Sequence, residues 1–404
     1  MREVVITGVG AASPVGNTLD EARDTYLAGR AVYTLDDPGT SSRVRVSARV
    51  REDLTAGLPT STVKLADRCA LLALQSSIRA MTDAGYLDGG YDDTRFGTFL
   101  GCGSGSLETM YALHESLLLR NAMSATSLVK VLPNAPASHV SMRFGLRGEC
   151  LTFAIACASS AVALGSAYKA IRYGELDYAI AGGVETPFSE ASIRAWEAMR
   201  VMARNDPEKP GASCRPYSKD RTGIVLGEGG AMFVLESAES AKARGAHVYA
   251  TIAGYGASGD ASHITLPQQA GQVAAMRNAL RDASMTPADI DYINAHGTAT
   301  EQGDLIETRS MRETFGAEAD ATPMSATKSI HGHLLGGSGA IEMLAVLVAL
   351  RDGLLPPTIN LDTPDPECDL DYVANVARQG VDVRAVMTNS FAFGGSNASM
   401  ILRR

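Results

Sequence analysis

Near its start the chain reads Val4-Val5-Ile6-Thr7-Gly8-Val9-Gly10, a β-branched run that ends in glycines, and this pattern predicts a buried strand. A second stretch, Ala250-Thr251-Ile252-Ala253-Gly254-Tyr255-Gly256, repeats the same spacing of apolar residues and glycines. Self-similarity between distant segments is typical of a fold built from repeated units. The echo therefore predicts two similar halves, residues 1–245 and 246–404.

Strand and helix patterns alternate along both halves and favour an α/β fold in which helices cover the sheets. Each half also has a strand that leads into a helix of small residues, once at Cys157 and once at residues 328–333. Small side chains allow close packing, so we expect both helices to lie buried between sheets. The expected helices are 18–28, 64–85, 159–173 and 334–345, the expected strands are 4–8, 96–100, 150–156, 178–181, 231–235 and 292–294, and residues 33–62 are expected to form a polar surface excursion.

The composition is that of an ordinary globular protein, with 45% hydrophobic and 20% charged residues in 404. A net charge of −9 gives no footprint for nucleic acid, and an acidic partner would need a local basic patch. The six cysteines form no CxxC pair and predict a reducing, cytoplasmic location. The first residues lack the apolar core of a signal peptide, and the apolar stretch 340–350 is too short to span a membrane.

Cys157 is the candidate nucleophile. It lies in Thr152-Phe153-Ala154-Ile155-Ala156-Cys157-Ala158-Ser159-Ser160, where the expected strand leads into a helix. Free N–H groups and the positive dipole end at a helix start favour a thiolate, which is the form that attacks a thioester. The alternative is a buried structural cysteine, and we assign that role to the other five cysteines.

Two histidines also follow predicted strands. His296 lies in Asn294-Ala295-His296-Gly297-Thr298 and His333 lies in Lys328-Ser329-Ile330-His331-Gly332-His333, so both imidazoles can face one cavity. The pair His331 and His333 suggests metal ligands, but no Asp, Glu or Cys ligand set accompanies it, and we expect no metal site.

A glycine-rich turn follows another predicted strand near the end of the sequence, in Asn389-Ser390-Phe391-Ala392-Phe393-Gly394-Gly395-Ser396-Asn397. Glycines at such a turn let backbone N–H groups approach a ligand closely. Its spacing is not that of a P-loop or of a dinucleotide-binding loop.

The segments quoted above, taken together in the order in which they occur along the chain, resemble the ketoacyl synthase family of condensing enzymes, within the thiolase-like superfamily. The resemblance runs nearly end to end and looks closest to the elongating type II synthases. It implies a five-layer αβαβα sandwich of two similar halves. The motifs that carry it are Val5–Gly10, Ala156–Ser160, Gly182–Glu185, Arg215–Arg221 with Gly227–Gly229, Ala295–Thr298, Lys328–Gly336 and Asn389–Asn397.

The implied activity is that of a 3-oxoacyl-[acyl-carrier-protein] synthase. Malonyl-carrier protein would lose CO₂ and condense with an acyl group held on Cys157, and no cofactor is implied beyond the phosphopantetheine of the acyl carrier protein. The residues that match the family's catalytic groups are Cys157, His296, His333, Lys328 and Glu342.

The resemblance also implies how the substrate is held. Backbone N–H groups of Cys157 and Phe393 match the family's oxyanion hole, and Phe393 resembles a gate on the acyl pocket. Thr298 and Thr300 match threonines that hold the phosphopantetheine arm. Family members dimerise through the sheet edges of their first halves, and Met110 matches a position at the far end of the acyl pocket.

Docking of an acidic carrier protein requires basic residues on this acidic chain. Lys64 and Arg68 are four residues apart on the expected helix 64–85 and would share a face. With Arg204 they form the predicted docking patch, for which a plain solvated helix face is the alternative.

Three rival assignments are disfavoured. A thiolase would carry a second cysteine near the C-terminal Gly-Gly turn, and an initiating synthase would carry asparagine in place of His333. A non-catalytic partner subunit would lack Cys157. The pathway stays open between fatty-acid elongation by a homodimer and a type II polyketide or polyene pathway, in which the chain would be active only with a homologous, chain-length-factor-like subunit.

Overall fold

The computed structural model describes residues 1–36, 45–206 and 208–404. Its main sheet has ten strands in the order β11-β10-β12-β13-β9-β1-β8-β6-β4-β5. The first five strands of this sheet along the sequence are β1 (Val4–Ala12), β4 (Phe96–Gly101), β5 (Cys150–Phe153), β6 (Tyr178–Glu185) and β8 (Gly229–Ser237). Their counterparts are β9 (Ala250–Gly259), β10 (Tyr292–Asn294), β11 (Met324–Ser325), β12 (Ala385–Ala392) and β13 (Ser396–Arg403).

The strand order confirms the duplication. Outward from the antiparallel β1–β9 pair, one half runs β8, β6, β4, β5 and the other runs β13, β12, β10, β11. In each half the second strand, β8 or β13, is antiparallel to both neighbours, and the remaining pairs are parallel. The two halves are therefore the same unit, joined through their first strands.

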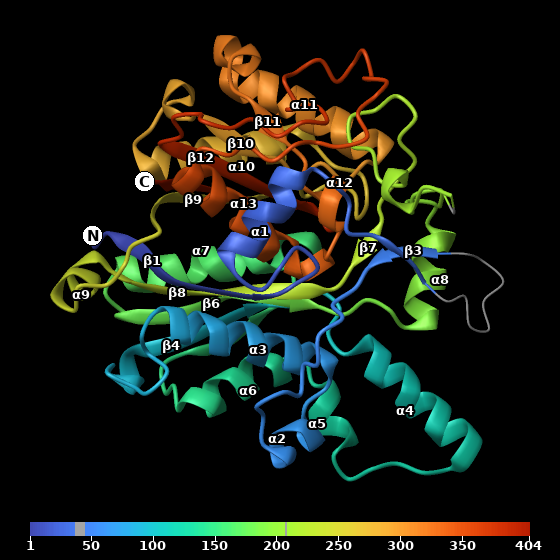
Figure 1. The fold of residues 1–404 in the computed structure, drawn as a ribbon, viewed down its shortest axis with the longest axis vertical. Coiled ribbons are helices and arrows are strands. Elements are labelled where there is room, and N and C mark those ends of the chain that lie inside the picture. The colour runs from blue at the N-terminus through green and yellow to red at the C-terminus, as the bar shows by residue number, and fades with distance from the viewer. Residues whose placement is uncertain (37–44, 207) are drawn as a thin grey trace.

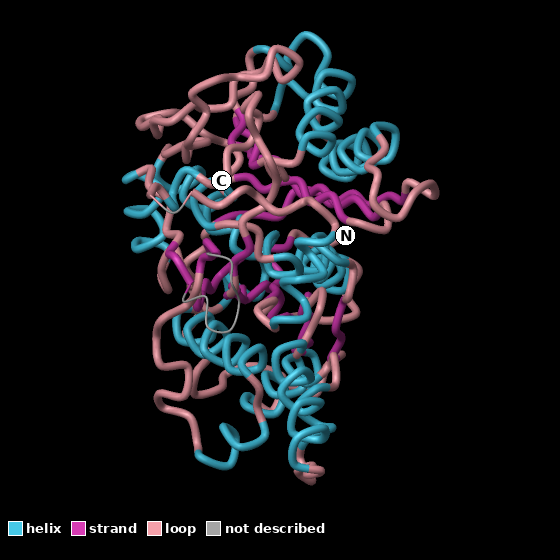
Figure 2. The backbone as a smooth tube through the Cα atoms, turned by 90° about the vertical axis from the view of Figure 1, so that its right-hand side faces the viewer, coloured by secondary structure: helices cyan, strands magenta, loops and turns pink. Residues whose placement is uncertain are grey.

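Helices form three layers around the two halves of this sheet (Figure 1). α3 (Arg68–Asp83) and α6 (Ala135–Phe144) cover the outer face of the first half, and α10 (Gln269–Ala283) and α11 (Glu301–Phe315) cover that of the second. α7 (Ser159–Arg172) and α13 (Ser338–Asp352) lie between the halves. The side view in Figure 2 shows strands in the middle of the molecule with helices above and below them. With α7 and α13 between the two halves, this arrangement is the expected αβαβα sandwich.

The remaining elements lie around this sandwich. A small sheet has the order β2-β3-β7. Its strands are β2 (Thr34–Asp36), β3 (Arg45–Ala48) and β7 (Leu226–Gly227). The other α-helices are α1 (Leu19–Ala28), α2 (Thr60–Leu65), α4 (Leu107–Arg120), α5 (Ser127–Val131), α8 (Glu190–Ala198), α9 (Ala238–Ala243) and α12 (Lys328–His331). Within the described ranges, no helix combines the length and apolar character needed to cross a membrane.

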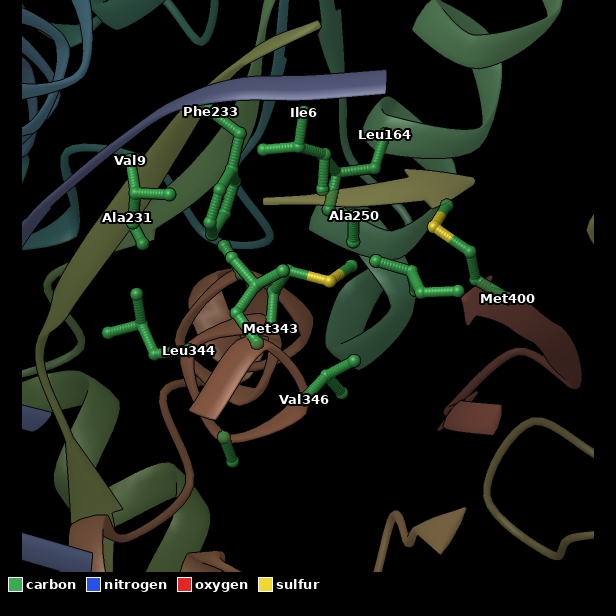
Figure 3. Close-up of a cluster of buried hydrophobic side chains, with 14 of the residues drawn as sticks. Ile6, Val9, Leu164, Ala231, Phe233, Ala250, Met343, Leu344, Val346 and Met400 are labelled. Atoms are coloured by element: carbon green, nitrogen blue, oxygen red, sulfur yellow. The ribbon is translucent and has the colours of Figure 1, made fainter. Parts of the chain in front are cut away.

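The largest core cluster joins the two halves. Figure 3 shows Ile6 and Phe233 of the first half gathered with Met343 of α13 and Met400 of β13. Every residue from 338 to 350 in α13 is buried, which explains why this helix is apolar all round. The middle layer is thus an apolar core shared by both halves.

The glycines of the repeated motif are required by close helix packing. A Cβ on Gly10 would lie 2.3 Å from the backbone nitrogen of Ala80 in α3. In the second half, a Cβ on Gly256 would lie 2.4 Å from the backbone nitrogen of Ala279 in α10. Each outer helix therefore packs directly against the backbone of its strand. The glycines are repeated in the two halves because both halves make this contact.

Two expectations about local structure are wrong. The expected helix 64–85 is two helices, because Ala66 is extended and the Asp67 side chain caps α3 by accepting the N–H of Ala70 at 2.8 Å. The expected excursion 33–62 contributes strands β2 and β3 and helix α2, and Val46 and Leu54 are buried. Residues 37–44 of that stretch lie outside the described residues.

We expect Gly256→Ala to lower the free energy of unfolding by about 1–3 kcal/mol, because the new methyl group overlaps the α10 backbone. Gly259→Ala in the same strand is the matched control, since a Cβ there meets nothing within 4 Å, and it should change stability by less than about 0.5 kcal/mol. Urea denaturation measures both, and equal effects would contradict the close packing.

Candidate active site

Cys157 lies on a strained connection between β5 and α7. The preceding residue, Ala156, has φ of +41°, and a short 3₁₀ turn, Ala156–Ala158, leads into α7 at Ser159. The Ser159 hydroxyl donates to the Ala156 carbonyl at 2.7 Å and accepts the N–H of Ile155 at 2.8 Å. These bonds hold a backbone conformation that non-glycine residues rarely adopt, and they fix the buried thiol at the start of the helix.

His296 follows β10 and is held by a buried carboxylate. Glu307 of α11 accepts the backbone N–H groups of His296 and Gly297, both at 2.8 Å, and the hydroxyl of Tyr217 at 3.0 Å. The sequence did not identify Glu307, because its contact with the histidine loop depends on how α11 packs. Its only sequence signal is an acidic residue in a helix that follows the His296 loop.

The hydrogen bonds fix the tautomer of His333. Its Nδ1 accepts the backbone N–H of Leu335 at 3.1 Å and lies 2.8 Å from the hydroxyl of Ser338. A backbone N–H can only donate, so Nδ1 is the acceptor and the imidazole proton is on Nε2. His333 therefore has a single ring donor, on the side away from its own loop.

Lys328 fixes His296 in the same way. Its ammonium group lies 3.4 Å from Nδ1 of His296, donates to the His296 carbonyl at 2.6 Å, and forms a short ion pair with Glu342. An ammonium group only donates, which again assigns the proton to Nε2. Burial raises the pKa of Glu342 to about 7, and the charge of Lys328 opposes this rise.

The thiol and the two imidazoles converge. The sulfur of Cys157 and one ring nitrogen each from His296 and His333 lie within 4.8 Å of one another, and the ring centroids are 5.6 Å apart. Burial lowers the pKa of both histidines well below the ordinary value, and the positive charge of Lys328 lowers them further. Both imidazoles are thus neutral N–H donors at neutral pH.

The expected thiolate at Cys157 is wrong for the resting site. Burial raises the pKa of the thiol to about 11, although Lys328 and the backbone N–H groups of Phe393 and Cys157 act to lower it. Desolvation outweighs these groups because the thiol is almost completely buried. The same two N–H groups that favour negative charge on this sulfur are the ones expected to form an oxyanion hole.

A cavity of about 710 Å³ opens onto this site. Cys157, His296 and His333 line it, together with Phe393, whose ring stacks on Trp196. Further residues in the lining are Thr298, Thr300 and Arg204, and the two threonine hydroxyls are 2.9 Å apart. The cavity therefore joins the thiol to a polar wall that can hold an extended substrate arm.

Other predicted residues lie elsewhere. Met110 is on α4, is 37% exposed, and is not part of the cavity lining. Lys64 is on α2, whereas Arg68 begins α3 and forms a two-pronged ion pair with the buried Glu228. The argument that Lys64 and Arg68 share one helix face is therefore wrong, and Arg68 has a structural role.

His331 is a structural histidine. Its Nδ1 lies 2.8 Å from the carbonyl of Gly332 and its Nε2 lies 3.0 Å from the hydroxyl of Thr327. Burial lowers its pKa to about 3. Among the described residues, the one His, Cys, Asp and Glu group with metal-ligand spacing is the cluster of Cys157, His296 and His333, to which His331 does not belong.

A buried cysteine beside two neutral imidazoles, on a duplicated thiolase-like fold, is the arrangement of a thiol-dependent condensing enzyme. The family model for the β-ketoacyl synthase N-terminal domain matches residues 1–241, and that for the C-terminal domain matches residues 249–362. The chain belongs to the β-ketoacyl synthase family and is a ketosynthase of the acyltransferase class.

Relatives match over the full length. The chain is 40% identical to nodulation protein E of Rhizobium sp. (strain N33), covering 100% of this chain and 99% of the relative. It is 37% identical to 3-oxoacyl-[acyl-carrier-protein] synthase 2 of Coxiella burnetii, with the same coverage. These similarities confirm the resemblance found in the sequence.

Solved structures show the same fold. A β-ketoacyl synthase from Burkholderia phymatum STM815 has a TM-score of 0.93 at 34% identity, with both chains covered completely. The ishigamide ketosynthase/chain length factor has a TM-score of 0.91 at 30% identity, covering 100% of this chain and 99% of that one. A type II polyketide synthase acyl-carrier protein in complex with its ketosynthase, bound to the hexaketide, gives 0.91 at 28% identity with the same coverage.

We expect the alkylation rate of Cys157 by iodoacetamide to keep rising between about pH 7 and pH 10, because burial holds the thiol pKa near 11. Intact-protein mass spectrometry measures the rate, and Cys157→Ala supplies the background from the exposed Cys150. A plateau below about pH 9 would contradict a protonated resting thiol.

Proposed function

We propose that this protein is a 3-oxoacyl-[acyl-carrier-protein] synthase that joins a malonyl-derived unit to an acyl group carried on Cys157. The observation that carries the proposal is the meeting of the Cys157 thiol with the imidazole rings of His296 and His333 in one cavity. Both rings are neutral and carry their proton on Nε2. The six free cysteines support a reducing, cytoplasmic setting.

In the first step the thiol of Cys157 takes the acyl group from the thioester of a carrier protein. The carbon–sulfur bond to the phosphopantetheine breaks as the bond to Cys157 forms, and the thiol proton leaves on the departing sulfur. The tetrahedral intermediate carries an oxyanion, which the backbone N–H groups of Cys157 and Phe393 would stabilise.

In the second step malonyl-carrier protein loses its carboxylate as CO₂, and the remaining electron pair forms an enolate. Negative charge develops on the thioester oxygen, and the Nε2–H groups of His296 and His333 would donate to it. The enolate carbon attacks the acyl carbonyl, and Cys157 leaves as a thiolate that regains a proton. Decarboxylation drives the reaction, so no cofactor is required.

The cavity favours this reaction over that of a thiolase. Among the described residues that line it, Cys157 is the only cysteine, and the turn after β12 presents Phe393 and glycines instead. Thr298 and Thr300 lie on the cavity wall, where they would hold the phosphopantetheine arm.

Carrier-protein docking is assigned to the mouth of this cavity. Arg200 and Arg204 line it and are exposed, and Lys64 is on α2. One solved structure similar to this chain is that of a type II polyketide synthase acyl-carrier protein in complex with its ketosynthase, which supports a carrier protein as the partner. Arg68 is left out because the buried Glu228 holds its guanidinium group.

A dimer is supported by the apolar surface of the first half. Every residue of α4, which lies wholly in the described part of the chain, is at least partly exposed, and Leu118 and Leu119 are 83% and 75% exposed. Strand β5 is the edge strand of the first half in the sheet order, and its Leu151 is 42% exposed. We propose that a second copy or a homologous subunit covers this surface.

We expect Cys157→Ala to form no acyl-enzyme with an acyl-carrier-protein donor, because the attacking sulfur is gone. Intact-protein mass spectrometry detects the acyl adduct, and Cys214→Ala, which removes another buried thiol, is the control. An acyl adduct on Cys157→Ala would exclude this residue as the nucleophile.

We expect His296→Ala and His333→Ala each to slow CO₂ release from malonyl-carrier protein by about 10²–10³-fold, because each removes one donor to the developing oxyanion. Acylation of Cys157 should fall less, and single-turnover assays measure the two steps separately. Equal losses in both steps would show that the histidines have other roles.

We expect the double charge reversal Lys64→Glu and Arg204→Glu to weaken carrier-protein binding, most strongly at low salt, because basic residues steer the acidic partner. Lys242→Glu, at an exposed position on α9, is the control and should leave the affinity unchanged. Calorimetry at two salt concentrations tests this, and unchanged affinity of the double variant would remove the patch.

Native mass spectrometry should show a dimer. Expression of this chain alone then distinguishes a second copy of the chain from a homologous subunit as the partner. A stable, active homodimer supports fatty-acid elongation, whereas a chain rescued only by a synthase-like subunit supports the polyketide pathway.

Met110→Trp should shorten the longest acyl group accepted if the partner encloses this exposed residue against the pocket. A fully active monomer would overturn the dimer.

A further inference from the structure

Glu185, the last residue of β6, is a fully buried carboxylate with an unusual set of donors. Its Oε2 accepts the backbone N–H groups of Gly103 at 2.8 Å, Ser104 at 3.1 Å and Gly336 at 3.1 Å. Its Oε1 accepts the hydroxyl of Ser104 at 2.7 Å. One side chain thus satisfies backbone donors from three positions.

These donors come from both halves of the molecule. Gly103 and Ser104 follow β4 in the first half, whereas Gly336 lies in the 3₁₀ turn Leu335–Gly337 of the second half. A Cβ on Gly336 would lie 2.2 Å from the backbone nitrogen of Gly103, so the two backbones are in direct contact. Glu185 therefore binds the backbone of both halves at a point where the two halves are in direct contact.

The two segments that Glu185 binds each lie next to a segment that positions a catalytic side chain. A Cβ on Gly103 would lie 3.2 Å from the carbonyl of Ala156, the residue before Cys157. On the other side, Gly336 follows Leu335, whose N–H holds the ring of His333. Displacement of either segment would change the separation of the thiol and the imidazole.

We propose that Glu185 is a positioning residue that sets the distance between Cys157 and His333 by binding the backbone of both halves at once. The inference rests on the proposed condensation reaction and adds to it a residue that does not touch the substrate. It acts through the three backbone N–H groups on Oε2, and its charge is secondary.

The charge of Glu185 has a separate, measurable effect. It raises the pKa of Cys157, after the larger effect of burial. Burial raises the pKa of Glu185 itself, and its hydrogen bonds lower it. Geometry and charge can be separated, because glutamine keeps the length and one acceptor oxygen, whereas aspartate keeps the charge but is one methylene shorter.

The experiment compares Glu185→Gln with Glu185→Asp. Glutamine can place its oxygen at the Oε2 position and donate to the Ser104 hydroxyl, so condensation should stay within about fivefold of the wild type. Aspartate cannot reach all the backbone donors, and condensation should fall about 100-fold, the cost typical of a misplacement near 1 Å. The alkylation midpoint of Cys157 should move to lower pH in Glu185→Gln.

Glu236→Gln and Glu236→Asp are the matched controls. Glu236 is also fully buried in the first half, where it binds Arg244 and Tyr86, and thermal unfolding gives the stability cost of each change. The Glu236 variants should lose stability without the 100-fold fall in condensation. Condensation in Glu185→Asp that equals or exceeds that in Glu185→Gln would overturn the positioning role.

The wild type is assayed first with acyl- and malonyl-carrier protein. If it neither acylates Cys157 nor releases CO₂, either alone or together with a homologous synthase-like subunit, the proposed function fails, and the inference about Glu185 fails with it. If the wild type condenses and the two Glu185 variants match their Glu236 counterparts, only the inference about Glu185 is overturned.

Discussion

The burial of the catalytic groups at the junction of the two halves determines the chemistry of the site. Burial raises the pKa of Cys157 and Glu342 and lowers the pKa of His296 and His333, so each group is driven toward its neutral form. The positive charge of Lys328 lowers the pKa of both histidines further, and Glu342 forms an ion pair with Lys328. The site thus offers uncharged N–H donors to a negative charge that exists only during the reaction, which is where such donors are most effective.

The sequence was sufficient for the architecture because the repeated features have packing causes. The glycines of the two echoing strands are required by α3 and α10, which rest on the strand backbones. The small residues after Cys157 and His333 correspond to α7 and α13, which lie buried between the sheets. Cys157 and His296 were found because each follows a strand, and His333 because its segment precedes the helix of small residues, α13. All three line one cavity, to which both halves contribute.

Features that depend on packing between distant segments could not be predicted. The pKa of Cys157 reflects how deeply the helix start is buried, which the local dipole argument leaves out. The carboxylate of Glu185 contacts loops far away in the sequence, and that of Glu307 reaches the nearby His296 loop only through the packing of α11. No spacing rule connects either carboxylate to its donors. The break between α2 and α3 follows from a capping bond at Asp67, within a stretch whose apolar periodicity continues through it.

The duplication also explains why the two halves contribute different groups. In the first half, Ala156 has positive φ, a 3₁₀ turn follows, and α7 begins at Ser159. In the second half, Leu335 has positive φ, a 3₁₀ turn follows, and α13 begins at Ser338. Gly336 therefore occupies the position that corresponds to Cys157. A side chain there would overlap the backbone of the first half, so only one of the two equivalent turns has room for a nucleophile, and the other supplies the backbone against which that nucleophile is placed.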